Sequence, residues 1–243
     1  MTTSPDRAVM LSQLRQQLQR TRTSALMVQT VETGLKVLDD ILPGNGFSTG
    51  SVVEWISDQP GMLAGSIALT CIRPFLKMSG CLAVIDSHGE FHLPAAVSRG
   101  IPASRILLVR PDHPSDSLWA LEQASLSAGV RVVLCWLDRV SSTVMRRLQL
   151  AVERSGVTLF LIRPAQVLQQ PSWADLRLTL TTGRPVAVEP SSDMIDHQLI
   201  TVRLVRSRHT IRPTNPAILK IDHETGAVHS VCQLADSAAP SKR

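Results

Sequence analysis

Five short runs of apolar residues alternate with helical segments along the middle of the chain, and this order limits the fold most. The run that ends at Asp86 is continuously apolar, which is typical of a strand that a parallel sheet buries on both faces. Strands alternating with helices of this length predict right-handed crossovers and an α/β fold. The expected strands cover residues 51–56, 81–86, 105–110, 130–137 and 157–163.

The segments between these runs carry helical signals. The expected helices cover residues 62–77, 93–99, 115–128 and 141–155. Pro74 predicts a kink or an early end in the first of them, because proline lacks the N–H that a helix interior needs. Gly100 is expected to end the second helix, and Ser115 is a suitable N-cap for the third.

The pattern changes after residue 163. Residues 171–180 become strand-like at their end, and residues 197–206 alternate in a way that predicts a half-exposed antiparallel pair at a sheet edge. Residues 218–228 predict a closing hairpin. The fold class that follows is α/β, with a mostly parallel central sheet flanked by helices and antiparallel strands at its C-terminal edge.

The two ends of the chain differ from the middle. Residues 8–22 have apolar positions at helical spacing among arginines, which indicates an amphipathic helix that either packs on its own domain or docks a partner or DNA. We expect residues 1–28 to form this helix and a linker, residues 29–233 one domain, and residues 234–243 a disordered tail. The polar N-terminus and the lack of a long apolar run predict a cytoplasmic protein with no membrane partner.

Composition leaves the class of partner open. The formal charge of +5 and the pI near 9.5 suit nucleic acid, an acidic partner or solubility alone. Aromatic residues make up 3% of the chain, which weakens the case for base-stacking platforms. The four cysteines form no C-x-x-C pair, so they are expected to be free thiols rather than zinc ligands.

A degenerate phosphate loop follows the first expected strand. A working loop reads G-x-x-x-x-G-K-[ST], in which backbone amides cradle phosphates, the lysine reaches them and the hydroxyl holds magnesium. Here the two glycines are Gly61 and Gly65. The second is followed directly by Ser66, and no lysine occurs between Ser57 and Arg73. The loop therefore keeps a glycine-rich frame without its phosphate-binding lysine.

Other chemistry has weaker support. His88 and His92 flank Glu90, but the surrounding Gly and Pro predict a loop, so polar loop histidines are favoured over a metal site. No serine stands in a G-x-S-x-G motif, so a hydrolase triad has no nucleophile at the expected turn. The sequence predicts neither a metal nor a catalytic residue.

The order of the segments resembles the core of the RecA recombinase superfamily over roughly residues 30–222. The segments that carry this resemblance are residues 33–54, 82–86, 93–101, 106–112, 174–178 and 200–208. A narrower similarity, over residues 132–137, 145–151 and 160–164, is to the ImuA family, a group that includes the SulA cell-division inhibitors.

The resemblance implies a damaged nucleotide site. It places Trp136 where the superfamily strand ends in an aspartate. It also places His88 where a water-activating glutamate follows the aspartate matching Asp86. Trp136 is expected to fill the core beside the vacated nucleotide site. ATP hydrolysis and a cofactor are not expected, while weak ATP binding through backbone amides stays open. The residues of the degenerate site are Gly61, Gly65, Ser66, Asp86, His88 and Trp136.

The resemblance also implies a function. It predicts a non-catalytic accessory protein of damage-induced translesion DNA synthesis in SOS mutagenesis. The implied partners are an ImuB-type Y-family-like protein and an error-prone DNA polymerase, with DNA and a RecA-type filament as further candidates. The alternatives are a SulA-like division inhibitor and a divergent RecA/RadA-type DNA-dependent ATPase. Candidate contacts to DNA or a partner, which could equally be a solvated surface with ion pairs, are Arg146, Arg147, Arg163, Trp173, Arg206 and Arg208.

Overall fold

The computed structural model describes residues 28–58, 62–77, 79–183, 197–208, 215–222 and 225–231. The predicted N-terminal helix, the predicted tail and Gly61 lie outside these residues. The division of the chain at residues 28 and 234 therefore stays a prediction.

The described residues form one large sheet of nine strands in the order β11-β10-β9-β8-β3-β7-β6-β4-β5. Strands β8, β3, β7, β6, β4 and β5 run parallel, and β9, β10 and β11 continue the sheet in antiparallel pairs. The predicted α/β class, with antiparallel strands at one edge, is confirmed. The bounds are β3 Val52–Ser57, β4 Cys81–Ile85, β5 Ile106–Val109, β6 Val130–Trp136, β7 Thr158–Pro164, β8 Leu176–Thr182, β9 His197–Ser207, β10 Ala217–Asp222 and β11 Val228–Ser230.

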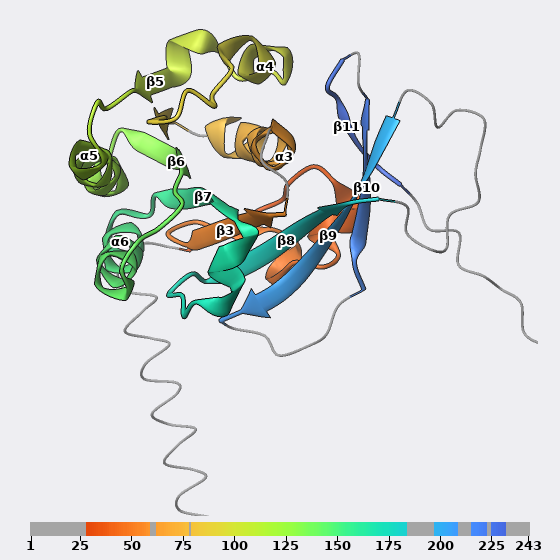
Figure 1. The fold of residues 1–243 in the computed structure, drawn as a ribbon. Coiled ribbons are helices and arrows are strands. Elements are labelled where there is room, and N and C mark those ends of the chain that lie inside the picture. Colours follow the sequence, from red (N-terminus) through yellow and green to blue (C-terminus); the bar gives the residue numbers. More distant parts are fainter. Residues whose placement is uncertain are drawn as a thin grey trace, which may run out of the picture.

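Helices cover both faces of the parallel strands (Figure 1). On one face, α3 and α4 pack against an aromatic cluster in which Phe160 contacts the rings of Phe47, Trp55 and Phe75. On the other face, α5 and α6 enclose a second core that includes Leu148. A short β1–β2 ladder precedes the large sheet. The remaining bounds are β1 Thr30–Val31, β2 Phe47–Ser48, α2 Lys36–Asp39, α3 Met62–Ile72, α4 Leu93–Ser98, α5 Pro114–Leu126, α6 Ser142–Ser155, η1 Pro43–Asn45, η2 Arg73–Lys77, η3 Ala103–Arg105 and η4 Ala165–Gln169.

The helix ends follow local chemistry. As Pro74 predicts, α3 stops early, and the chain continues as the 3-10 turn η2. Helix α6 begins after Ser141, whose Oγ accepts a hydrogen bond from the N–H of Val144, and it ends at Gly156 with φ 76°. The prediction that Ser115 caps α5 is wrong. That helix begins one residue earlier, because Pro114 suits the first helical position, where no N–H is needed.

The C-terminal strands are antiparallel as predicted, but β9 does not lie at the sheet edge. It pairs with β8 on one side and β10 on the other, and β11 forms the edge. Strand β10 covers β9 because Leu219 and Ile221 extend the same core as Ile200. The predicted closing hairpin is confirmed as β10 and β11.

Candidate functional site at the carboxyl edge of the parallel sheet

The topology marks one position at which a ligand crevice is expected. Strand β4 connects outward to β5, whereas its neighbour β6 connects in the opposite direction to β7. Open α/β sheets bind ligands outside the carboxyl ends of strands at such a switch point. Asp86 and His88 follow β4, Trp136 ends β6, and Gly65 and Ser66 lie in the first turns of α3. The structure therefore brings five of the six predicted site residues to one edge of the sheet.

Trp136 packs against the first turns of α3. A β-carbon placed on Gly65 would lie 3.2 Å from Cζ2 of Trp136, so the indole rests directly against the helix backbone. The ring of Phe91 meets the indole edge-on, with 6.5 Å between ring centroids. Gly65 and Ser66 line a very small gap beside the indole. Trp136 thus lies over the turn of α3 that carries Gly65 and Ser66.

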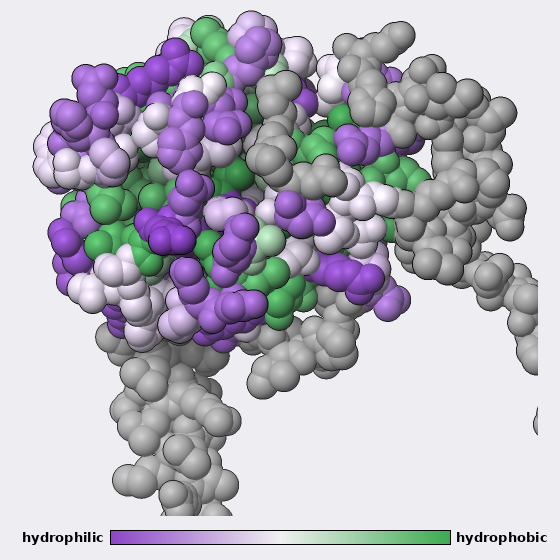
Figure 2. Space-filling model, in the orientation of Figure 1, coloured by the Kyte–Doolittle hydropathy of each residue, from purple (hydrophilic) through white to green (hydrophobic). Residues whose placement is uncertain are grey.

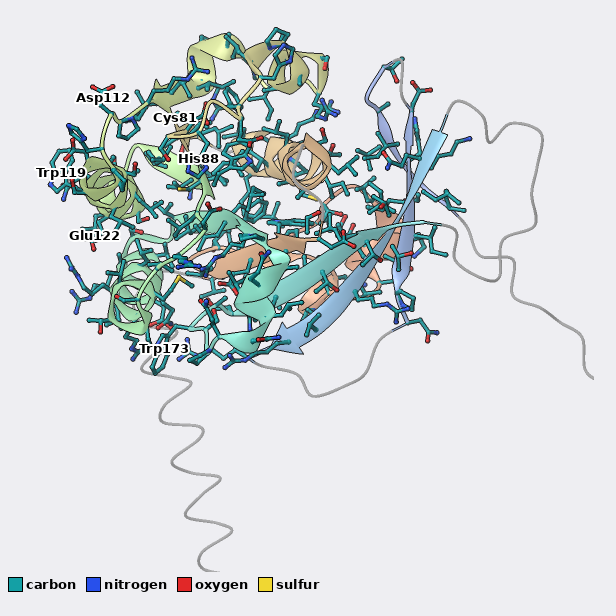
Figure 3. The ribbon with its side chains drawn as sticks, viewed as in Figure 1. Cys81, His88, Asp112, Trp119, Glu122 and Trp173 are labelled. Carbon is teal, nitrogen blue, oxygen red and sulfur yellow. The ribbon has the colours of Figure 1, made fainter. Side chains whose placement is uncertain are left out.

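Two shallow hollows flank Trp136, each of about 270 Å³. Both are bordered by His88, Trp136 and Asp138. The first hollow also has the carboxylates of Asp58 and Glu90 at its border. The second lies toward α5 and includes Ser87, Pro111, Asp112, His113, Ser117 and Arg139. In Figure 3, His88 lies among the elements of the molecule's upper half, while Asp112 lies near its outer margin.

Asp86 holds the loop after β4. Its carboxylate is buried and accepts hydrogen bonds from the backbone N–H groups of Glu90 at 2.8 Å and Phe91 at 3.2 Å. The Nε of Arg110 lies 3.2 Å from the same carboxylate. Asp86 therefore has a structural role in fixing this loop, whereas His88 is exposed on it. Within the residues that the structure describes, no group of three or more His, Cys, Asp or Glu side chains could hold a metal ion.

A buried ion triad supports the floor of the site, and the sequence did not reveal it. Glu54, on β3, lies 2.6 Å from the guanidinium of Arg163 and 2.6 Å from that of Arg177. Arg163 also donates to the carbonyls of Leu137 and Asp138, at 3.0 and 3.2 Å. The prediction that Arg163 is a surface contact is wrong, because its side chain is buried under the loop that follows Trp136.

The thiol of Cys135, next to Trp136 in the chain, is unreactive. Burial raises the pKa of Cys135 to about 12, with a further rise from the charge of Asp86 and an opposing effect of Arg163. This thiol stays protonated at neutral pH and is no nucleophile there. Among the described residues that line the first hollow, the one arginine is already paired with Glu54, and the other charged groups are carboxylates. Such a border is poorly suited to a triphosphate, which needs cationic donors.

The remaining predicted contact residues divide into two groups. The guanidinium groups of Arg147 and Arg208 lie 2.6 Å from Glu122 and 3.2 Å from Glu153, so each already has a carboxylate partner. Arg146 lies over the ring of Trp173, 4.6 Å from its centroid. Arg206 donates to the carbonyl of Ser172 at 2.7 Å, beside Trp173. The structure therefore gathers Arg146, Trp173 and Arg206 on one surface.

Figure 3 shows Trp173 at the lower end of the molecule, and Trp119 and Glu122 around α5.

None of the helices in the described part of the chain is both long enough and apolar enough to span a membrane.

Comparison with known proteins places the chain among RecA-related sequences. No protein-family model matches it. It is 27% identical over 124 residues to ImuA of Caulobacter vibrioides, which is 49% of this chain and 51% of ImuA. It is 27% identical over 120 residues to RecA of Mycoplasma genitalium, 49% of this chain and 34% of RecA. It is 28% identical over 113 residues to the cell division inhibitor SulA of Photorhabdus laumondii, 45% of this chain and 64% of SulA.

The matches thus span about half of ImuA and about a third of RecA. They confirm the resemblance of the sequence to the RecA superfamily and to the ImuA family. The chain is an ImuA-like α/β protein related to RecA and SulA.

Proposed function

We propose that this chain is a non-catalytic, RecA-like accessory protein of damage-induced translesion DNA synthesis. It acts by docking to other proteins, with contact to DNA as a second activity. The similarity to ImuA and RecA supports a role in the response to DNA damage. The partners that we propose are an ImuB-type Y-family-like protein and an error-prone polymerase, with a RecA-type filament as a further candidate.

One observation carries the non-catalytic part of the proposal: the indole of Trp136 rests on the backbone of α3 at Gly65. Phosphoryl transfer needs a lysine on the β- and γ-phosphates, a magnesium ligand and a group that orients water. The sequence has no lysine between Ser57 and Arg73, and Asp86 is engaged by its own loop. We propose that the fold is kept as a scaffold and that no cofactor is required.

Co-purification tests the partner class. The full chain is co-expressed with an ImuB-type protein from the same organism and, separately, with its tubulin-like division protein, and each mixture is passed through affinity and size-exclusion columns. We expect a stable complex with the ImuB-type protein only. A complex with the division protein, and none with the ImuB-type protein, would refute the proposal.

That second outcome corresponds to a SulA-like division inhibitor, which one observation favours. The match covers 64% of Photorhabdus laumondii SulA, against 51% of Caulobacter vibrioides ImuA. A SulA-like protein would also need no nucleotide site, so Trp136 suits both candidates. The identity of the partner, rather than ATP chemistry, separates them.

A further inference from the structure

A mixed apolar and basic surface surrounds Trp173, outside the linings of both hollows. We call it the Trp173 patch and define it by Arg146, Leu168, Trp173, Val205 and Arg206. Its three apolar side chains are 39%, 40% and 54% exposed, in the order Leu168, Trp173 and Val205. Large apolar side chains that stay exposed on neighbouring segments are candidates for an interaction surface.

The fold fixes the indole before any partner arrives. The Nε1–H of Trp173 donates to the Oγ of Ser142 in the first turn of α6, at 3.0 Å. The guanidinium of Arg146, one helical turn further along α6, lies 4.6 Å from the ring centroid. Because two contacts hold the ring, little side-chain entropy is lost when its exposed part is covered. Trp173 has the properties of a preorganised anchor.

The neighbouring strands bring the other members of the patch to the same surface. Arg177 donates to the carbonyls of Val167 and Gln170, at 2.6 and 3.2 Å, and so ties the segment carrying Leu168 to β8. The register of β8 and β9 shifts at Arg177, which leaves Val205 as the extra residue of a β-bulge. Arg206 then reaches the carbonyl of Ser172. Figure 2 shows hydrophobic surface bordered by hydrophilic residues over the lower ends of β8 and β9.

The charges of the patch define what can cover it. Among the described residues, neither Arg146 nor Arg206 has a carboxylate partner, in contrast to Arg147 and Arg208. An occupant must therefore bring negative charge together with apolar side chains. Leu168 and Val205 offer nothing on which a base can stack, and Arg146 already covers one side of the Trp173 ring. Within the described part of this surface, a nucleic acid would meet two unneutralised arginines, which is few for phosphate-driven binding.

We propose that the Trp173 patch binds a segment of a protein partner in which Asp or Glu side chains alternate with Leu, Ile or Phe. This proposal rests on the docking function proposed above and gives the chemistry that the docked partner must present. The apolar side chains would cover Trp173, Leu168 and Val205, and the carboxylates would meet Arg146 and Arg206. Bidentate pairing makes arginine well suited to such contacts.

Peptide selection tests the proposal without knowledge of the partner. A displayed library of random short peptides is selected on the full-length chain, and peptides that also bind the Arg146→Glu/Arg206→Glu variant are removed. We expect the enriched peptides to combine acidic and apolar residues. Their affinity should fall about tenfold or more in Trp173→Ala, since aromatic and arginine anchors carry most of the binding energy in interfaces. Lysine versions of the same peptides should bind the double Glu variant better than the wild type.

Matched variants control for folding and for general stickiness. Trp119→Ala removes another exposed tryptophan, and Arg154→Glu reverses another exposed charge on α6; neither should weaken the peptides. Circular dichroism checks that each variant is folded, and Arg206→Glu alone replaces any variant that is not. Selection of no patch-dependent peptide, or of peptides without acidic residues, overturns the proposal. Binding of single-stranded oligothymidylate, or of a second copy of the chain, that is lost in Trp173→Ala also overturns it.

Failure here and failure of the proposed function give different results. Co-purification reports which protein is bound, whereas the selection reports the chemistry of one surface. An ImuB-type complex that survives Trp173→Ala and Arg206→Glu would leave the proposed function standing and remove the Trp173 patch as its docking site.

Discussion

The contact between Trp136 and Gly65 is the residue-level feature on which the interpretation of the site depends. Glycine inside a helix is about 1 kcal/mol less favourable than alanine, so it is kept where a side chain does not fit. Here the limiting atom is Cζ2 of Trp136, 3.2 Å from the place of a β-carbon. The two residues should therefore be energetically coupled.

A double-mutant cycle measures this coupling. In the Trp136→Ala background, we expect Gly65→Ala to stabilise the protein by about 1 kcal/mol, because the helix gains its ordinary propensity. In the wild-type background the same change should give no stabilisation, since the indole must shift. Urea unfolding of the four proteins gives the values. Equal effects in both backgrounds would show that the indole does not rest on α3.

The buried triad of Glu54, Arg163 and Arg177 predicts a second, larger effect. Removal of one member of a buried ion group leaves uncompensated charge, which typically costs about 3–5 kcal/mol. We expect Glu54→Gln to destabilise the protein by an amount in this range in urea unfolding. The exposed pair of Lys36 and Asp40, 3.4 Å apart, is the control, and Asp40→Asn should cost about 0.5 kcal/mol or less. Similar losses for the two variants would contradict the assignment.

At the scale of elements, α5 and α6 begin in different ways. Ser141 caps α6 through its side chain, whereas Ser115 lies inside the first turn of α5 with its Oγ 3.3 Å from the carboxylate of Asp116. Loss of a serine N-cap costs about 1 kcal/mol. Ser141→Ala should therefore lower the free energy of unfolding by about this amount, and Ser115→Ala should change it by less than half as much. The reverse order would show that Ser115 is the cap after all.

The elements themselves could be predicted from the sequence because their signals are local. Apolar runs predicted five of the six parallel strands in the described sheet, and Pro74 predicted the early end of α3. The errors arose where the outcome depends on distant partners. Alternation in residues 197–206 indicates one exposed face but does not reveal that β10 covers the edge. In the sequence, Arg163 resembles a surface residue. Its burial depends on Glu54, which lies more than a hundred positions away in the chain.

The candidate site, like the fold, could be predicted only in part from the sequence. The missing lysine and the unusual Trp136 are visible in the sequence, and the fold brings Gly65, Ser66, Asp86, His88 and Trp136 to one sheet edge. The contact between Trp136 and Gly65 needed coordinates, because it joins residues 71 positions apart. The role of Arg177 was missed, since a single arginine in an alternating strand gives no signal of burial.

At the scale of the whole molecule, two surfaces with different lining residues can be distinguished. The carboxyl edge of the parallel strands carries the hollows beside Trp136, and the Trp173 patch is formed by α6, η4 and the β8–β9 pair. We propose that the first surface no longer supports ATP chemistry and that the second offers apolar and basic side chains to a partner. A protein built in this way would act by what it binds.

Steady-state hydrolysis of MgATP tests the central claim most directly. The purified full-length chain and its Ser66→Ala variant are assayed with and without single-stranded DNA. If Trp136 closes the former nucleotide site, both proteins should show no hydrolysis above a protein-free blank, with or without DNA. DNA-dependent hydrolysis by the wild-type chain that is lost in Ser66→Ala would contradict the claim and identify a working ATPase.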